Sequence, residues 1–121
     1  MKLVICEKPS VGAAVAAALG VTGRKDGYIE GNGYLISWCI GHLVQLSEAA
    51  AYGEQYRKWS YDSLPILPQE WQYTVAADKG KQFKILKDLM HSADVSEVVN
   101  ACDAGREGEL IFRFVYHQAG C

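Results

Sequence analysis

The chain has 121 residues, of which 50% are hydrophobic and 21% charged, and its formal net charge is −2. This length and apolar content suffice for one domain with its own core and need no disulfide staples. The slightly acidic balance argues against a free-standing, sequence-independent nucleic-acid binder, which is normally basic, but it leaves room for an enzyme whose basic surface lies elsewhere.

The first predicted element is a buried strand over Lys2–Cys6. Glu7-Lys8-Pro9-Ser10 breaks this apolar run, and a helix is expected over Val11–Leu19, with Ser10 as its N-cap and Gly20 as its stop signal. Because the helix is small and apolar nearly all round, it should pack closely on a sheet and not lie on the surface.

A loop is expected over Gly20–Gly27, followed by a hairpin. The β-rich runs Tyr28–Glu30 and Tyr34–Cys39 flank Gly31-Asn32-Gly33, whose residues tolerate positive φ. Gly41-His42-Leu43 then turns the chain into a short segment over Val44–Ala51.

Residues 52–69 predict an irregular loop, longer than the usual connection of about 4–6 residues. Pro65 and Pro68 interrupt both helix and strand there. Tyr56, Trp59 and Tyr61 could stack on nucleic-acid bases. Packing of such a loop onto the body of the protein is the more common use of these aromatic residues.

The remaining elements are a strand over Trp71–Val75, a helix over Lys79–Met90, a strand over Glu97–Cys102 and a helix over Glu107–Gln118. The two helices are expected to bury Phe83, Leu86 and Met90, and Leu110, Ile111, Phe114 and Val115. Together the elements predict an α/β fold: one domain over residues 1–121, with a Rossmann-like, mostly parallel sheet, helices on both faces and an inserted β-hairpin.

Two strand–turn–helix units place an acidic residue directly after a cysteine at a strand end, in Cys6-Glu7 and Cys102-Asp103. If the strands are parallel neighbours, Glu7 and Asp103 emerge at one edge, and Glu107 follows on the next turn. Two carboxylates about 4 Å apart repel by about 4 kcal/mol at an effective dielectric constant near 20, so a divalent cation or a shared proton must compensate.

Oxygen-only ligands, with no histidine or cysteine pattern nearby, favour Mg²⁺ at this edge. Lys8 and Arg106 flank it and suit phosphate oxygens, so the cluster indicates phosphoryl-transfer chemistry. The alternative is a solvated acidic turn that caps the last helix.

His42 could contact a DNA phosphate or be a hydrogen-bonded turn histidine. Glu109 is explained by an i,i+4 pair with Arg113.

Other classes of function find little support. No GxxxxGK motif is present, so binding of a nucleoside triphosphate is not expected. No signal peptide is visible, and no apolar run approaches the roughly 20 residues of a membrane span. The four cysteines contain no CxxC pair and are expected to be reduced thiols, with Cys6 and Cys102 buried, in a cytoplasmic protein.

Several motifs resemble the Toprim domain of type IA DNA topoisomerases, and most closely that of the topoisomerase III group. They are Glu7-Lys8-Pro9-Ser10, Gly41-His42-Leu43, Leu64–Trp71 and Asp103-Ala104-Gly105-Arg106-Glu107-Gly108-Glu109. The resemblance covers essentially the whole chain. It implies a Rossmann-like sheet that binds Mg²⁺ and acts on single-stranded or supercoiled DNA near the nucleoid, where a tyrosine cleaves the strand, becomes linked to its 5′ phosphate, and religation follows.

Carried over by position, Glu7 matches a metal-site glutamate that is also an acid–base candidate, and Lys8 matches a lysine that contacts the scissile phosphate. The resemblance thus implies Glu7, Lys8 and Arg106 as catalytic residues. It implies Glu7, Asp103 and Glu107 as metal ligands. Lys8, His42 and Arg106 are the residues expected to bind DNA.

The chain departs from the family pattern in two ways. Gly105 stands where Asp-x-Asp is common, so one metal ligand is missing, and none of the seven tyrosines matches the nucleophile motif. We therefore expect a domain excised from a longer polypeptide, unable to relax DNA alone. The alternatives are a standalone Toprim module for DNA binding or recombination mediation, and a Toprim nuclease or primase-type enzyme.

Overall fold

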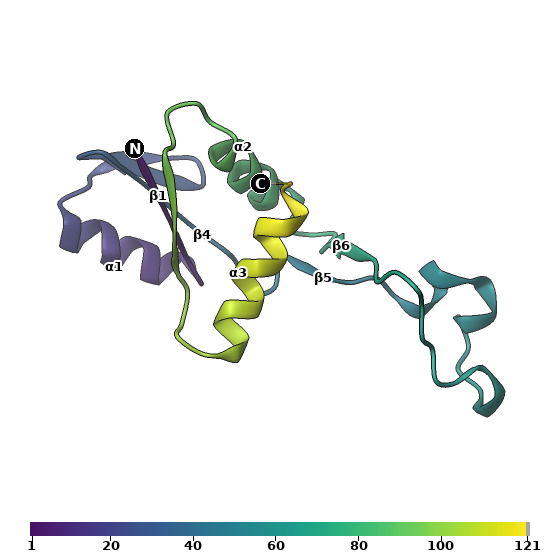
Figure 1. Cartoon of the computed structure of the whole chain (residues 1–121). Helices are drawn as coiled ribbons and strands as arrows, with labels where there is room; N and C mark the ends of the chain where they lie inside the picture. Colours follow the sequence, from purple (N-terminus) through teal and green to yellow (C-terminus); the bar gives the residue numbers. More distant parts are fainter. Residues whose placement is uncertain (121) are drawn as a thin grey trace.

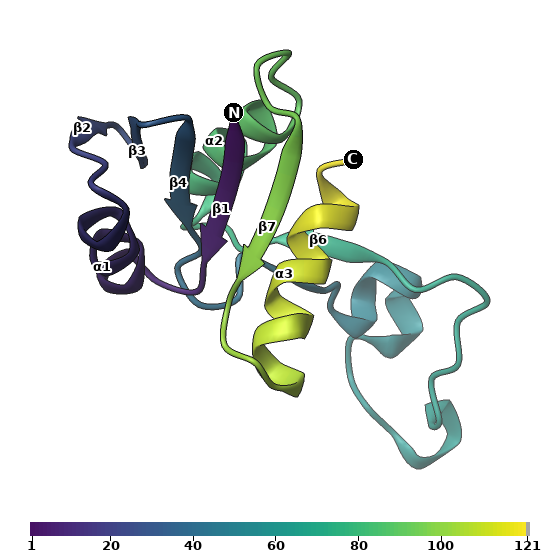
Figure 2. The same ribbon diagram turned by 60° about the vertical axis from the view of Figure 1, so that its left-hand side comes forward.

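The main feature of the molecule is a five-stranded sheet with strand order β2-β3-β4-β1-β7 (Figure 2). The computed structural model describes residues 1–120, except for the side chains of Tyr56 and Ser63. β1 pairs in parallel with β4 and β7, whereas β3 runs antiparallel to β2 and β4, so four of the five strands point the same way. The strands are β1 (Lys2–Cys6), β2 (Gly23–Lys25), β3 (Tyr28–Gly31), β4 (Tyr34–Trp38) and β7 (Glu97–Ala101).

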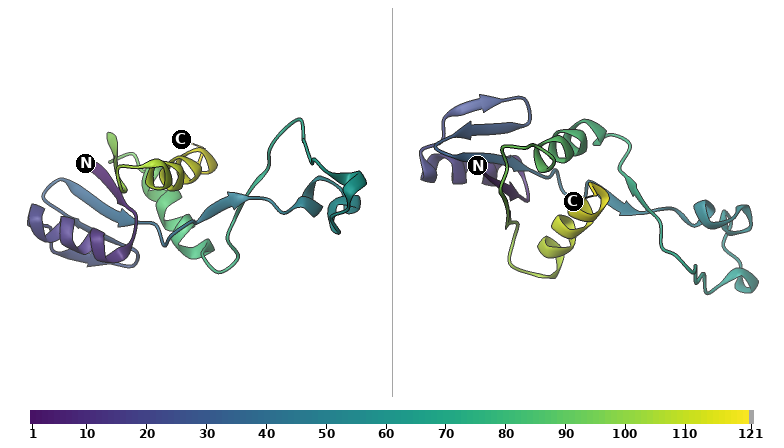
Figure 3. Two further views of the ribbon diagram at one scale, coloured as in Figure 1. Left: turned by 90° about the horizontal axis from the view of Figure 1, so that it is seen from below. Right: turned by 45° about the horizontal axis from the view of Figure 1, so that its top comes forward.

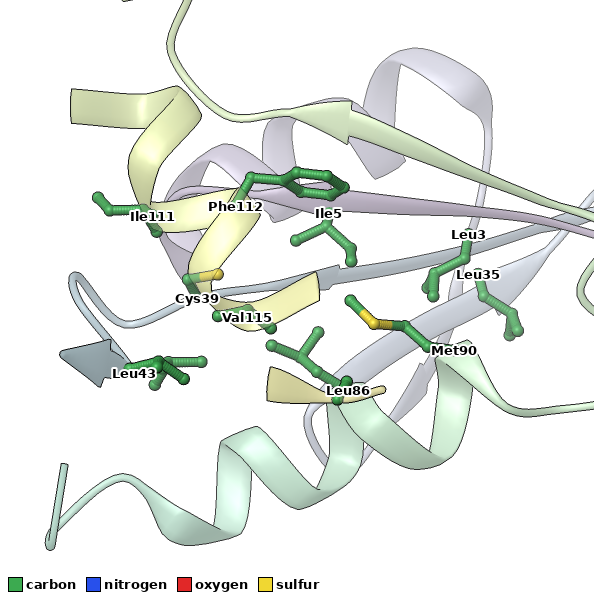
Figure 4. Packing of buried hydrophobic residues seen from close by; sticks show 12 residues of the cluster. Leu3, Ile5, Leu35, Cys39, Leu43, Leu86, Met90, Ile111, Phe112 and Val115 are labelled. Atoms are coloured by element: carbon green, nitrogen blue, oxygen red, sulfur yellow. The ribbon is translucent and has the colours of Figure 1, made fainter. Parts of the chain in front are cut away.

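Helices cover both faces of this sheet, which confirms the predicted α/β architecture (Figure 1). α1 (Pro9–Leu19) lies on one face, and α2 (Gly80–Met90) and α3 (Arg106–Gln118) lie on the other. Side chains alternate along β1 accordingly. Val4 packs on the α1 side, and Leu3 and Ile5 pack among α2 and α3 (Figure 4).

The N-terminus of α1 differs from the sequence prediction. The helix begins at Pro9, with Lys8 as the N-cap residue, so Ser10 lies inside the first turn and is not the cap. The fixed φ of proline suits the first helical position, and this moves the start forward. Gly20, at φ +69°, ends the helix as predicted.

The expected close packing of α1 on the sheet is confirmed, but the expectation that the helix does not lie on the surface is wrong. Only Gly12 and Ala16 are buried, and Gly12 sits so close to β4 that a Cβ there would come within 2.7 Å of the Trp38 ring. Ala14, Ala17 and Leu19 face outward. Because no further layer covers α1 among the described residues, half of its surface stays exposed despite its apolar composition.

The hairpin is confirmed, with Asn32 and Gly33 at positive φ between β3 and β4. The segment Gly20–Gly27, expected as a loop, contains the short strand β2. β2 pairs with the outer edge of β3, which would otherwise leave its backbone groups unpaired.

A buried glutamine joins α2 to the hairpin. Gln82 is only 8% exposed, and its amide donates to the Trp38 carbonyl at 2.8 Å and to Ser37 Oγ at 3.2 Å. Ser37 Oγ in turn donates to the Gly27 carbonyl at 2.7 Å. Gln82 thus takes the innermost position that the sequence pattern gave to Phe83, which is half-buried, while Leu86 and Met90 are buried as predicted.

The buried face of α3 is also rotated from the predicted one. Phe112 is buried together with Ile111 and Val115, whereas Leu110 is 39% exposed. Phe114 is only partly buried. It lies beside Tyr73, with ring centroids 5.0 Å apart, because this side of α3 turns toward a second, smaller sheet.

This second sheet consists of β5 (Val44–Leu46) and β6 (Tyr73–Val75), paired antiparallel. Residues 47–72 leave it as an arm that extends away from the body (Figures 1 and 3). The arm contains three short 3₁₀ turns over Ala49–Tyr52, Glu54–Tyr56 and Tyr61–Ser63. The irregular loop is therefore confirmed, but the expected packing onto the body is wrong, since Trp59 and Tyr61 are 70% and 96% exposed. The Tyr56 side chain lies outside the described residues.

None of the helices within residues 1–120 is both long and apolar enough to cross a membrane.

Candidate active site at the carboxyl end of the sheet

Glu7 and Asp103 meet where two neighbouring parallel strands end. β1 and β7 are paired with Cys6 opposite Ala101, so Glu7 follows directly on one strand and Asp103 two residues after the other. A side-chain hydrogen bond with Asp103 raises the pKa of Glu7; desolvation and repulsion by Asp103 and Glu107 add to the shift, and Lys8 opposes it. The proximity of Asp103 therefore makes the charged form of Glu7 less favourable in the metal-free chain.

The turn that carries Asp103 is held by Asn100. The Asn100 amide donates to Glu109 Oε2 at 2.9 Å, and its oxygen accepts the Cys102 N–H at 3.1 Å. The Gly105 N–H donates to the Asp103 carbonyl at 2.9 Å. We did not predict this role for Asn100. Its signal in the sequence is a single amide that follows two valines near the end of the strand.

Two glycines in this turn serve different purposes. A Cβ at Gly108 would lie 2.1 Å from the Asp103 carbonyl oxygen, so glycine is required for α3 to approach the turn. Gly105 has an extended backbone, with φ −170°, and open space around the position of a Cβ. Steric constraint therefore does not explain why this position lacks the second aspartate of the family pattern.

Glu107, the third predicted ligand, is held apart by a histidine. His42 Nε2 lies 2.5 Å from Glu107 Oε1, and Lys79 Nζ donates to the His42 carbonyl at 3.4 Å. Within residues 1–120, no three histidine, cysteine or acidic side chains are arranged to hold a metal ion. The structure therefore brings two of the three predicted ligands together and places the third against His42. The sequence did not reveal the contact between His42 and Glu107, because the two residues are 65 positions apart.

The predicted phosphate-binding cations lie on either side of the carboxylates. Lys8 caps α1, and its backbone carbonyl accepts the N–H groups of Val11 and Gly12, each at 3.1 Å. Arg106 begins α3, is exposed, and forms no ion pair within the described part of the chain. Arg113 Nε donates to Glu109 Oε1 at 2.7 Å, so Glu109 is structural, as expected.

Three free thiols lie beneath the carboxylates. Cys6 and Cys39 are buried and Cys102 is partly exposed, so the expected burial holds fully for Cys6 and only in part for Cys102. A hydrogen bond from Cys39 lowers the pKa of the Cys102 thiol, whereas burial raises the pKa of Cys6 to about 11. Cys102 Sγ also contacts the Ile5 carbonyl at 3.8 Å. Cys121 lies outside the described residues.

Comparison with known proteins places this edge in a family. Residues 2–120 match the family model described as the Toprim domain. The chain is 45% identical over 118 residues to the DNA topoisomerase 3 of Shouchella clausii, which covers 98% of the chain and 16% of that protein. It is 41% identical to the DNA topoisomerase 3 of Staphylococcus epidermidis (98% of the chain, 17% of the relative) and 42% identical to that of Bacillus anthracis (93% and 16%). The chain, which spans about a sixth of the length of these relatives, belongs to the Toprim family.

Proposed function

We propose that the chain is the Mg²⁺-binding Toprim domain of a type IA DNA topoisomerase of the topoisomerase III kind, working as one domain of a longer polypeptide. The observation that carries this proposal is the Glu7–Asp103 pair at the ends of β1 and β7 in a chain related to DNA topoisomerase 3 proteins. By the same relationship, its partners are single-stranded or supercoiled DNA and the other domains of that polypeptide, in the bacterial cytoplasm.

The donor set fits a hard divalent cation. Glu7 and Asp103 offer only carboxylate oxygens, which are the ligands Mg²⁺ prefers, and their mutual repulsion makes added positive charge favourable between them. Glu107 contacts His42 through Oε1, so its second carboxylate oxygen is the one that could join them while this contact is kept. Bound Mg²⁺ would supply positive charge beside a phosphodiester. Because Gly105 contributes no carboxylate, we expect weak binding of the metal.

The residues of the chain itself then have distinct tasks. Glu7, whose pKa is raised by the neighbouring Asp103, would give a proton to the departing oxygen of the cleaved strand and take it back from the resulting hydroxyl on religation. Lys8 and Arg106 balance the charge of the phosphate on either side. His42 adds a hydrogen-bonding group at the same edge. The nucleophilic tyrosine belongs to another part of the longer polypeptide.

The test is relaxation of a negatively supercoiled plasmid by this chain joined to the corresponding remainder of the Shouchella clausii DNA topoisomerase 3. We expect Mg²⁺-dependent relaxation that is lost in Glu7→Gln and Lys8→Met and kept in the matched surface variant Lys84→Met. Activity that survives Glu7→Gln would contradict the proposal.

The 121-residue chain alone, assayed in parallel, is expected to leave the plasmid supercoiled. Relaxation by this chain alone would contradict the proposal that the nucleophilic tyrosine comes from another domain. Mg²⁺-dependent cleavage of single-stranded DNA by the chain alone would favour the nuclease alternative.

A further inference from the structure

The arm, residues 47–72, carries an exposed hydrophobic surface. Among the described side chains, ten large hydrophobic residues are exposed, and seven of them lie on the arm or on the strand ends that carry it. These seven are Leu46, Trp59, Tyr61, Leu64, Leu67, Trp71 and Tyr73. No described side chain between residues 46 and 73 belongs to either hydrophobic core. Exposed apolar surface of this density marks an interaction site.

The base of the arm is nevertheless fixed to β5 and β6. Gln72 N–H donates to the Tyr52 hydroxyl at 2.9 Å, and that hydroxyl donates to the Gln72 carbonyl at 3.3 Å. The Tyr52 and Trp71 rings meet edge to face with centroids 6.3 Å apart, and Ser47 N–H donates to Gln72 O at 2.8 Å. The base from which the arm extends is therefore held in place, which lowers the entropy cost of docking.

Charge distinguishes between the possible occupants. The arm carries four carboxylates (Glu48, Glu54, Asp62 and Glu70) against two cations, Arg57 and Lys58. Arg57 is already paired with Glu54, with Nε 2.8 Å from Oε1. A surface for a phosphate backbone would need an excess of cations. Exposed tryptophan, tyrosine and leucine with a sparse polar rim instead match the core of a protein–protein interface.

A shallow depression beside Trp59 adds to this character. It has a volume of about 330 Å³ and is lined by Glu48, Ala49, Ala50, Arg57 and Trp59. Small alanine walls next to a large aromatic ring give a side chain from another surface a place to insert. This is the arrangement in which interface anchors contribute most of the binding energy.

We propose that the outer part of the arm, residues 57–71, is the surface on which another domain of the same longer polypeptide docks onto this domain. The inference depends on the proposed function, because the relatives that match this chain devote only 16–17% of their length to the matching region and so contain the candidate partner domains. Trp59 and Leu67, 70% and 76% exposed, are the anchors.

The experiment compares the isolated chain with the chain joined to the remainder of the Shouchella clausii DNA topoisomerase 3, without DNA. Amide hydrogen exchange of residues 57–71 is expected to slow at least tenfold in the joined protein, and tryptophan fluorescence to shift to shorter wavelength. The double variant Trp59→Ser/Leu67→Ser should abolish both changes. It should also lower the thermal midpoint of the joined protein while leaving that of the isolated chain unchanged. Leu19→Ser, on exposed α1, is the matched control and should have neither effect on the arm.

Equal exchange of the arm in both proteins would overturn the inference, as would a variant that destabilises the isolated chain by the same amount. Protection that appears only when a single-stranded oligothymidine is added would assign the arm to DNA. Protection of the isolated chain that grows with its concentration would assign the arm to self-association. Arm protection in a joined protein that fails to relax DNA would leave this inference standing and contradict the proposed function alone.

Discussion

The carboxyl edge of the sheet and the arm differ in where their interactions are completed. At the edge, four of the six predicted site residues have a side-chain partner within the described chain: Glu7 neighbours Asp103, and Glu107 contacts His42. On the arm, Trp59 and Tyr61 project outward from a fixed base. The side chains of the edge thus find partners within this domain, whereas the outer hydrophobic side chains of the arm stay exposed. Substitutions at the edge should therefore act in the isolated chain, and substitutions on the arm should not.

The largest effect is expected from Gly108→Ala. The added Cβ would lie 2.1 Å from the Asp103 carbonyl oxygen, so either α3 or the turn must move, and we expect a loss of about 3 kcal/mol in the free energy of unfolding. Chemical denaturation measures this loss. Gly105→Ala is the matched control, because its Cβ meets open space, and it should change stability by less than about 0.5 kcal/mol. Equal losses in the two variants would mean that the close approach of α3 is not required.

Gln82→Leu tests the polar junction between α2 and the hairpin. It removes the donor to the Trp38 carbonyl and leaves Ser37 without one of its partners, so we expect a loss of about 2 kcal/mol. Lys84→Ala, on the exposed face of α2, should be nearly silent in the same denaturation experiment. A neutral Gln82→Leu would show that the buried network is replaceable by apolar packing.

Gly105→Asp is expected to strengthen Mg²⁺ binding by about tenfold, because it adds a carboxylate beside Asp103 at a position with free space. Isothermal titration of the isolated chain with MgCl₂ measures the change. Gly105→Asn has nearly the same shape without the charge and should give a smaller gain. Unchanged affinity in Gly105→Asp would place the metal away from this turn.

The pH dependence of stability tests the raised pKa of Glu7. Its pKa is raised in the folded state, so the folded chain binds more protons than the unfolded chain between the ordinary glutamate pKa of 4.5 and the raised value. The free energy of unfolding should therefore fall as pH rises through this window. Glu7→Gln should remove that slope and leave the metal-free chain folded and slightly more stable at neutral pH. A slope that persists in Glu7→Gln would assign it to another group.

The smallest effect is expected on the arm. Trp59→Ser in the isolated chain removes a side chain that is 70% exposed, so the free energy of unfolding should stay within about 0.5 kcal/mol of the wild-type value. Thermal unfolding followed by circular dichroism measures it. A loss comparable to that of Gln82→Leu would erase the distinction between the two regions.

The sequence predicted the parts of the molecule in which local pattern and tertiary environment agree. Three local patterns predicted the observed structure correctly. They are the apolar run Lys2–Cys6, the Asn32-Gly33 turn and the glycine after α1. The parallel pairing of β1 and β7 placed Glu7 and Asp103 together, as their matching positions after strand-end cysteines implied.

The rest depended on contacts between distant segments. Gln82 is buried because Trp38 and Ser37 offer partners that no helical periodicity reveals. His42 contacts Glu107, which is 65 residues away in the sequence. The sequence pattern therefore predicted three neighbouring carboxylates, whereas the structure pairs only Glu7 with Asp103. Packing onto the body is the usual role of residues such as Trp59 and Tyr61, and they are exposed here. Residue composition alone does not distinguish a loop that folds back onto the body from an arm that extends away from it.

The central claim is that Glu7 and Asp103 form one Mg²⁺ site at the end of β1 and β7. Its most direct test is a titration of the isotopically labelled chain with MgCl₂, followed by NMR in wild type and in Asp103→Asn. In the wild type, the resonances of Glu7 and Asp103 should shift first, at millimolar Mg²⁺, followed by those of Glu107 and His42 as their contact opens. In Asp103→Asn these shifts should be lost. Shifts confined to other residues, or unchanged shifts in Asp103→Asn, would contradict the account.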